Sequence, residues 1–161
     1  MAEVTIRVAS AADAATIVRM IRALAAYENL LDQVRIEEAD VLRDGFGPRR
    51  CFECLLAEIA GETVGFALYL DEYSTFEGRS GMYVEDLFVT EAARGRGIGR
   101  MLLARLAAIA RERGGTTLSL IVLHWNPARE FYHRLGFAEA KGWLPYRMTG
   151  AALERLAAED R

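Results

Sequence analysis

The chain has 161 residues, of which 52% are hydrophobic and 27% charged, and its formal net charge is −3. This charge balance gives no basic footprint for a nucleic acid, and no apolar run is long enough to predict a membrane span. The composition is that of a globular protein, and the length fits one domain over residues 1–161.

The first third of the chain predicts one strand followed by two helices. Residues Val4–Val8 alternate apolar and polar side chains, which is typical of a half-buried strand. Ser10 and Asp13 have the spacing of a capping box, and the apolar stripe after them predicts a helix that ends near Asn29. A shorter helix is expected over residues 37–44, where glycines end it.

The middle of the chain predicts three antiparallel strands. Two β-prone runs, residues 51–59 and 63–69, are separated by a short turn that contains glycine, which predicts a hairpin. A turn-rich stretch then leads to a third run over residues 82–89.

The last part of the chain alternates helices and strands. After a glycine-rich loop, an apolar stripe predicts a helix that ends near Arg113. We expect a strand over residues 117–123, a short helix over 127–135, a last strand over 143–148 and a terminal helix over 151–158. This order predicts an α/β (α+β) fold in which helices flank a central mixed, mostly antiparallel sheet.

The two cysteines, Cys51 and Cys54, predict neither a disulfide framework nor a metal site. Their spacing is that of metal ligands, but the alternation of a strand would point the two thiols to opposite faces, and no second pair exists. Two cysteines are too few for a disulfide framework, and the N-terminus does not have the pattern of a secretory signal. We therefore expect a cytoplasmic protein.

The glycine-rich loop is the most informative segment. It reads Arg94-Gly95-Arg96-Gly97-Ile98-Gly99 and joins a strand to a helix. Glycines allow a tight turn that presents several backbone N–H groups to one point, and the helix start adds partial positive charge, which suits a pyrophosphate. The Gly-Lys-Ser/Thr triplet of a P-loop is absent, and the spacing GxGxG in mid-chain disfavours a dinucleotide-binding fold.

This loop resembles the acyl-coenzyme A signature of the GNAT acetyltransferase superfamily, Arg-x-x-Gly-x-Gly at a strand-to-helix turn. Further stretches resemble its spermidine/spermine (diamine) N-acetyltransferase branch, in an order and spacing that cover nearly the whole chain. They are LAAYE (24–28), DGFG (44–47), VGFA (64–67), YVEDLFV (83–89), LHWN (123–126) and FY (131–132).

The resemblance implies a GNAT fold, acetyl-CoA as cosubstrate without a metal, and a homodimer with active sites near the subunit interface. A bulge would splay one strand from its neighbour and open a slot for the cofactor. The cofactor-binding residues that it implies are Leu87, Phe88 and Val89 on that strand, Arg94, Gly95, Arg96, Gly97, Ile98, Gly99 and Arg100 around the pyrophosphate, and Asn126, Pro127 and Ala128 on the far side of the cofactor.

The same resemblance assigns the catalytic roles. Tyr132 matches the general acid and Glu85 the acidic residue near the attacking amine, while Tyr27, Glu28 and Trp143 match residues that line the amine site. A primary alkyl amine has a pKa of about 10.4 and is almost fully protonated at neutral pH. A base, acting directly or through a water, makes it nucleophilic, and an acid then protonates the leaving thiolate.

Structural interpretations of these residues stay open beside the functional ones. Glu85 and Asp86 are adjacent in an apolar strand, so that either could be a solvated acid and one of them buried. Tyr132 could be core packing, and Tyr27 with Glu28 a surface pair. Alternative functions are a protein or peptide N-acetyltransferase, a non-catalytic acyl-CoA-binding module, and a structural dimer with a decayed site.

Two positions depart from the polyamine enzymes. Thr75 stands where those enzymes carry an aspartate, and Lys141 where they carry a glutamate. A polycationic substrate would favour carboxylates at both places, because positive charge near Lys141 opposes it. The stretch around Thr75 looks more like the branch that acetylates thialysine. We therefore expect a small diamine or a lysine-like amino acid as the substrate, rather than spermine.

Overall fold

The computed structural model describes residues 3–160. This part of the chain forms two compact units, which are divided in the sequence between Leu123 and His124 and are described separately. No helix in the described range is long and apolar enough to cross a membrane.

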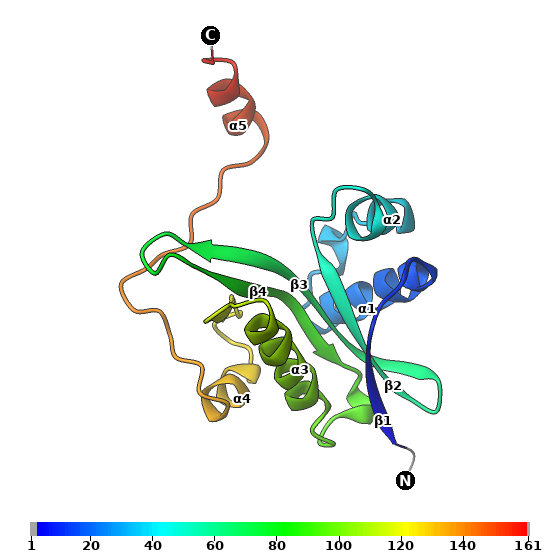
Figure 1. Ribbon diagram of the computed structural model, residues 1–161. Coiled ribbons are helices and arrows are strands. Elements are labelled where there is room, and N and C mark those ends of the chain that lie inside the picture. The colour runs from blue at the N-terminus through cyan, green and yellow to red at the C-terminus, as the bar shows by residue number, and fades with distance from the viewer. Residues whose placement is uncertain (1–2, 161) are drawn as a thin grey trace. The chain divides into compact units, whose positions relative to one another are not determined.

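The first unit is built on a five-stranded sheet whose strands lie in chain order (Figure 1). Each of the first four strands is antiparallel to its neighbour, whereas the fifth is parallel to the fourth, which confirms the expected mixed, mostly antiparallel sheet. The strands are β1 (Val4–Val8), β2 (Glu53–Ile59), β3 (Glu62–Ser74), β4 (Arg79–Val89) and β5 (Leu118–Leu120).

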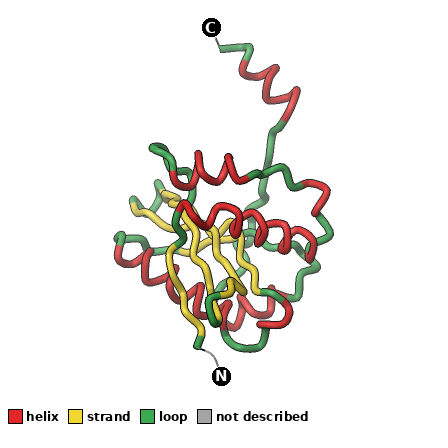
Figure 2. Tube along the Cα trace, turned by 90° about the vertical axis from the view of Figure 1, so that its right-hand side faces the viewer, coloured by secondary structure: helices red, strands yellow, loops and turns green. Residues whose placement is uncertain are grey.

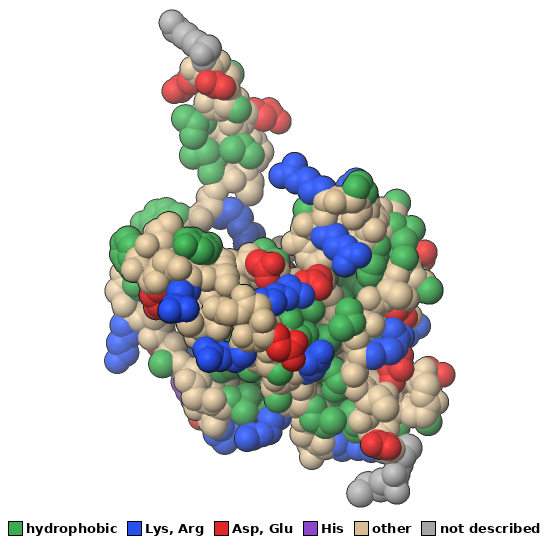
Figure 3. Space-filling model, viewed as in Figure 1, with side chains coloured by type: hydrophobic (Ala, Val, Ile, Leu, Met, Phe, Trp, Pro, Cys, Tyr) green, Lys and Arg blue, Asp and Glu red, His purple; other side chains and the backbone are tan. Residues whose placement is uncertain are grey.

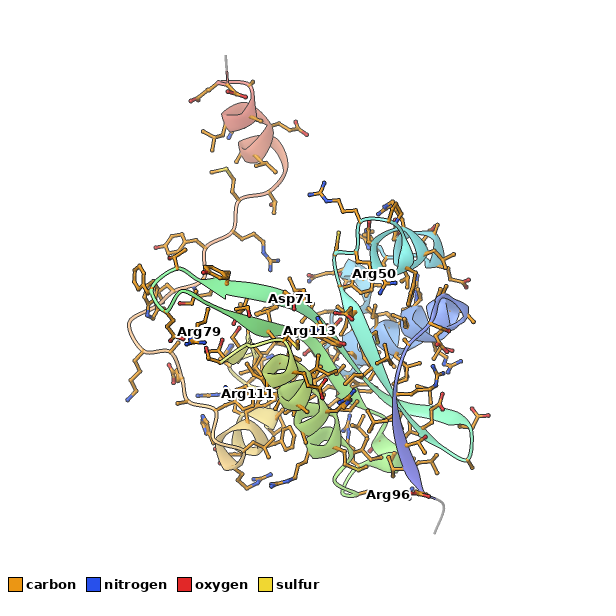
Figure 4. All side chains as sticks on the ribbon, in the orientation of Figure 1. Arg50, Asp71, Arg79, Arg96, Arg111 and Arg113 are labelled. Atoms are coloured by element: carbon orange, nitrogen blue, oxygen red, sulfur yellow. The ribbon has the colours of Figure 1, made fainter. Side chains whose placement is uncertain are left out.

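Three helices cover the two faces of this sheet. Helices α1 (Ala14–Tyr27) and α2 (Glu38–Phe46) lie on one face, and α3 (Ile98–Glu112) lies on the other (Figures 1 and 2). Arg113, at the C-terminal end of α3, ties this helix to the strands through ion pairs with Glu53 at 2.6 Å and with Asp71 at 3.2 Å, and Figure 4 shows it beside Asp71.

Alternation along the strands divides the core between the two faces. On the α1 and α2 side, buried strand residues pack with helix residues such as Ile17, Met20 and Val41 in one apolar cluster. Intervening strand residues are equally buried and face the α3 side, where the helix buries Leu102 and Leu106. The strand members of the first cluster are Cys54, Leu56, Phe66, Leu68 and Phe88.

A β-bulge interrupts the pairing of β4 with β3. Leu68 pairs with Asp86, but the next residue of β3, Tyr69, pairs with Val84, so that Glu85 is an extra residue without a partner in this register. Because of this residue, the alternation changes phase. Val84 shares a face with Tyr69 on the α3 side, whereas Asp86 shares a face with Leu68 on the α1 side.

The other edge of β4 is only partly paired. Strand β5 is shorter than the expected 117–123 and pairs with residues Met82, Tyr83 and Val84 alone. Residues 85–89 therefore continue beyond β5 with no strand partner on that side within the described range. This arrangement agrees with the expected splay between these two strands.

Two expected element boundaries on the α1 side are shifted. The strand predicted from Cys51 begins at Glu53, so that Cys51 is exposed in the preceding loop and Cys54 alone lies in the strand, buried. Helix α2 continues through Gly45 to Phe46 instead of ending before it.

The second unit contains two short helices, α4 (Ala128–Arg134) and α5 (Gly150–Ala157). The strand expected over residues 143–148 is wrong, because this segment has no regular secondary structure and all its side chains are exposed. A strand requires hydrogen bonds to a neighbouring strand, and no strand of the described chain pairs with this segment.

A cluster of charges fixes the start of α1 against the sheet. The guanidinium of Arg7 donates to both carboxylate oxygens of Asp13 at 2.8 Å and to Glu58 at 2.7 Å. Asp13 also accepts from the backbone N–H of Ser10 at 2.7 Å, which completes the capping box expected from the sequence. These hydrogen bonds, above all those from Arg7, hold the pKa of Asp13 well below its usual range.

The substitution Asp13→Asn should lower the free energy of unfolding by about 2 kcal/mol near neutral pH, because a charge-assisted pair becomes a neutral contact. The folded-state pKa is depressed, so this stabilisation is present above the unfolded pKa of about 3.9 and is lost as the pH falls below it. Urea denaturation at pH 7 and at about pH 3 should show the difference from the wild type shrinking in acid.

Asp40→Asn is the matched control for this substitution. Asp40 closes the same kind of capping box at the start of α2 and pairs with Arg43 at 2.9 Å, but it does so on an exposed surface. We expect a smaller loss of stability there. Equal losses in the two variants would show that the Arg7 pair adds nothing to helix capping.

Candidate active site

The loop between β4 and α3 is held open by two glycines in the left-handed region. After Val89 the chain makes a short turn over Glu91–Ala93, and then Gly95 and Gly97 adopt φ angles of +75° and +77°. Other residues adopt such angles only at a cost of about 1–2 kcal/mol. A Cβ added at either glycine would meet no protein atom within 4 Å, so there is open space beside both.

The N-terminus of α3 faces this loop without a side-chain cap. Gly97 is the capping residue, and because glycine has no side chain it provides no side-chain acceptor for the N–H groups of the first turn. The first backbone N–H groups of a helix have no partner inside the helix and carry partial positive charge. Arg96 and Arg100 are exposed beside them, and Figure 4 shows Arg96 on this loop. Backbone donors and cations therefore meet where the sequence predicts the pyrophosphate.

Arg94 connects the glycine loop to the end of α1. Its Nε donates to the carbonyl oxygen of Val89 at 3.1 Å. Its guanidinium carbon lies 4.6 Å from the ring centroid of Tyr27 and 5.7 Å from that of Phe88, within the range of cation–π attraction. The two rings are themselves 6.2 Å apart. The expected cofactor residues Phe88 and Arg94 and the expected amine-site residue Tyr27 thus form one contact group.

Carboxylates surround the bulge of β4 on the same side. Glu28 caps the C-terminal end of α1 next to Tyr27, and partial burial raises the pKa of its carboxyl. Asp86 is partly buried, and burial, followed by the charges of Glu85 and Glu28, raises its pKa to about 7. Glu85 itself is exposed. Glu85 and Glu28 therefore lie within electrostatic reach of Asp86, at the point where the bulge turns β4.

The remaining predicted site residues belong to the second unit. Asn126 is buried, and its Oδ1 accepts from the backbone N–H of Ala128 at 2.9 Å, so that it organises the start of α4. Tyr132 packs between aromatic rings, with centroids 5.3 Å from Phe131 and 5.6 Å from Phe137. Pro127 and Trp143 are exposed, Trp143 by 75% of its surface.

The two cysteines differ in environment. Cys54 is buried in the core, and this burial raises the pKa of its thiol far above the usual range, whereas Cys51 is exposed. No group of three or more His, Cys, Asp or Glu residues in the described chain is arranged to hold a metal ion.

The sequence does not single out Asp86 as a site residue. Alternation along an apolar strand indicates that one of the two adjacent acids can be buried, and the resemblance points to Glu85 for function. In the structure Glu85 is the extra residue of the bulge and is exposed, while Asp86 turns toward the α1 side and is partly buried. Simple alternation from Val84 does not predict this, because the bulge changes the phase.

Comparison with known proteins gives concordant matches. The Acetyltransferase (GNAT) family matches residues 19–137. The thialysine N-epsilon-acetyltransferase of Bos taurus is 43% identical over 98% of this chain and 99% of the relative. The human spermidine/spermine N(1)-acetyltransferase-like protein 1 is 38% identical over 96% of this chain and 24% of the relative.

Solved structures agree in fold. An integron cassette protein from the mobile metagenome of V. cholerae superposes with a TM-score of 0.81 at 28% identity, over 96% of this chain and 97% of that one. An aminoglycoside acetyltransferase from an uncultured soil metagenomic sample gives a TM-score of 0.76 at 22% identity, over 91% and 99%.

The substitution Gly97→Ala tests whether the loop binds a diphosphate. Alanine at φ +77° should cost about 1–2 kcal/mol of stability and should weaken coenzyme A binding about tenfold, because strain displaces the amides at the start of α3. Gly61→Ala is the matched control, since Gly61 has φ +83° in the turn between β2 and β3 and equally open surroundings. Titration calorimetry and urea denaturation measure both effects, and equal coenzyme A affinity in the two variants would contradict a site on this loop.

Proposed function

This chain belongs to the acetyltransferase (GNAT) family and is an N-acetyltransferase, and from that premise we propose that it transfers the acetyl group of acetyl-CoA to the primary amine of a small, lysine-like molecule. The observation that carries the proposal is the open glycine loop at the start of α3, next to the edge of β4 that has no strand partner among residues 3–160.

The residues of the first unit fit a coenzyme A thioester. The N–H groups at the start of α3, with Arg96 and Arg100, would hold the diphosphate. The edge of β4 over residues 87–89 has no strand partner on the β5 side in the described range and offers its backbone to an extended pantetheine arm. The thioester supplies the activated acetyl group, which the amine attacks directly.

Acid–base roles follow the expectation from the sequence. Glu85, at the bulge, takes a proton from the substrate's ammonium directly or through a water, which exposes the nitrogen lone pair. Tyr132 gives a proton to the departing sulfur. Its ring is fixed by the flanking rings of Phe131 and Phe137, which would hold the hydroxyl in a constant direction. Tyr27, Glu28 and Trp143 would line the amine site, and Asn126, Pro127 and Ala128 the far side of the cofactor.

The choice of amine rests on charge. Glu28, Glu85 and Asp86 provide negative charge for one ammonium group. Thr75 and Lys141 supply no further carboxylate where polyamine enzymes have one, and Lys141 favours a substrate that carries its own carboxylate. The high identity to a thialysine N-epsilon-acetyltransferase over nearly the whole chain supports the same substrate class.

We also propose that the chain is one functional GNAT domain that works as a cytoplasmic homodimer. The family match crosses the division between the two units. In the second unit, several large apolar side chains are exposed: Tyr146 by 92% and Trp143 by 75%, with Leu153 and Leu156 on α5. Figure 3 shows apolar side chains, in green, on the surface of α5. Such a set favours burial against a partner chain.

A panel of amines tests the substrate class. With acetyl-CoA and detection of the released thiol, thialysine and lysine should give a higher kcat/KM than spermidine or spermine, because the site lacks two of the carboxylates that a polycation needs. A higher kcat/KM for spermine would contradict the role given to Thr75 and Lys141. Transfer only to peptides would favour a protein N-acetyltransferase.

Tyr132→Phe tests the general acid. It should lower kcat about 10²–10⁴-fold with little change in acetyl-CoA affinity, because only a proton donor is removed from a packed ring. Tyr146→Phe makes the same substitution at an exposed tyrosine of the second unit and should leave kcat unchanged. Steady-state kinetics give both values, and an unaltered kcat in Tyr132→Phe would exclude the assigned role.

A further inference from the structure

The carboxyl of Asp86 is partly buried in the first unit, and neither packing nor ion pairing explains its position. It lies on the α1 side of the sheet, on the face that carries the apolar residues Leu68 and Phe88. Its carboxylate oxygens make no hydrogen bond or ion pair with any residue from 3 to 160. A partly buried carboxylate without a partner destabilises a folded protein, because it gives up part of its hydration without compensation. Its position in β4 therefore calls for a functional explanation.

The bulge is what places this carboxyl in the site. Without the extra residue Glu85, the alternation of β4 would put Asp86 on the same face as Val84, toward α3. With it, Asp86 turns to the face where α1 ends and where Tyr27 lies against Phe88. Bulges commonly redirect a side chain in this way next to active sites.

The groups that surround Asp86 come from three elements and are mostly acidic. Glu85 adjoins it on β4, and Glu28 faces it from the end of α1; the charges of both act on it. From β2, the buried thiol of Cys54 is close enough for the two groups to interact. The nearby cation Arg94 is directed to the ring of Tyr27 and to the carbonyl of Val89 rather than to Asp86. The cluster therefore carries an excess of negative charge that favours a cation from outside the protein.

We propose that Asp86 is the group on which the proton of the substrate's ammonium comes to rest during acetyl transfer. The inference builds on the proposed function, and it adds a residue that the sequence did not assign. Glu85, exposed at the bulge, meets the ammonium first, and Asp86 behind it stores the proton. In this role Asp86 positions a proton rather than contacting the reacting carbon.

The step balances without a further reagent. One N–H bond of the ammonium breaks, and its electron pair stays on nitrogen as the nucleophile. The proton passes by way of Glu85 to a carboxylate oxygen of Asp86, which becomes neutral. Nitrogen then bonds to the acetyl carbon and gives up its second proton to solvent, the carbon–sulfur bond breaks, and the thiolate takes the proton of Tyr132. Afterwards the carboxylic acid of Asp86 returns its proton to solvent, and the phenolate of Tyr132 takes up a proton from solvent.

The environment gives Asp86 the affinity for a proton that this role needs. Burial and the two neighbouring charges raise its pKa to about 7, so that near neutral pH it can both accept and release a proton. Below that pH Asp86 is already protonated and cannot accept. The ammonium of the substrate has a pKa of about 10.4 and stays protonated across this range. A change in rate near pH 7 therefore reports the titration of a group on the enzyme, not on the substrate.

The first test is the pH profile of kcat/KM with thialysine or lysine between about pH 5.5 and 8.5, spanning the pKa of Asp86. The wild type should lose activity as the pH falls below about 7, approaching tenfold per pH unit. Asp86→Asn should be slower by about 10²–10⁴-fold at pH 8 and should lack this transition. Asp86→Glu should restore part of the rate and the transition. Asp71→Asn, an exposed aspartate of β3, is the control and should keep the wild-type profile.

The substitution Glu85→Gln distinguishes two roles of Asp86, as an acceptor of the substrate's proton or as a purely structural residue. Removing the neighbouring negative charge should lower the pKa of Asp86, so the residual activity should have its transition at a lower pH than the wild type. A structural role for Asp86 would leave the position of the transition unchanged.

Stability provides a readout that does not depend on turnover. The folded-state pKa of Asp86 is raised, so the stability that it contributes is complete below the unfolded pKa of about 3.9 and is lost as the pH rises through about 7. In urea denaturation Asp86→Asn should therefore gain stability relative to the wild type as the pH rises from about 5 to 8, and Asp71→Asn should not.

The outcomes separate the two proposals. Suppose that the wild type acetylates the amines and that the Asp86→Asn variant still shows the transition near pH 7. This result would overturn the role of Asp86 and leave the proposed function intact. A wild type that acetylates no amine overturns both. The loss of the transition in Asp86→Asn, together with the shift in Glu85→Gln, supports the proton store.

Discussion

The irregularity of β4 at Glu85 is the structural constraint on which the site depends. On one side of this point β4 is an ordinary inner strand, paired with β3 and with β5. On the other side it has gained a residue against β3 and lost β5, so that its backbone and its acids become available to ligands. A bulge weakens local pairing, and it persists because the long ladders on either side and the core on both faces leave the strand no better register.

Opposite charges are separated along this strand. Beyond its C-terminal end, arginines and the uncapped start of α3 create a positive environment suited to a diphosphate. At the bulge, Glu28, Glu85 and Asp86 create a negative one suited to an ammonium group. In the proposed reaction, a cofactor with an anionic end and an amine with a cationic end would be drawn to opposite ends of one strand segment, and their reacting groups would meet between them.

The end of α1 couples the two environments. Tyr27 contacts Phe88 of β4, and Arg94 of the glycine loop lies over both rings while it bonds the carbonyl of Val89. The start of α1 is fixed to β1 and β2 by the ion pairs of Arg7, so the helix holds its far end at a defined place. The proposed amine site is therefore attached to the same sheet as the loop.

The sequence by itself determined the element order of the first unit, the mixed sheet and the glycine loop, because these depend on local periodicity, on capping at Ser10 and on glycine at positive φ. It could not determine the phase change at Glu85 or the partial burial of Asp86. Residues 143–148 show the same limit: their composition favours a strand, but a strand exists only where another strand pairs with it. The tertiary structure decided which strand edges are paired and where the bulge lies. A bulge depends on the register between two strands, and the sequence of one strand alone does not define that register.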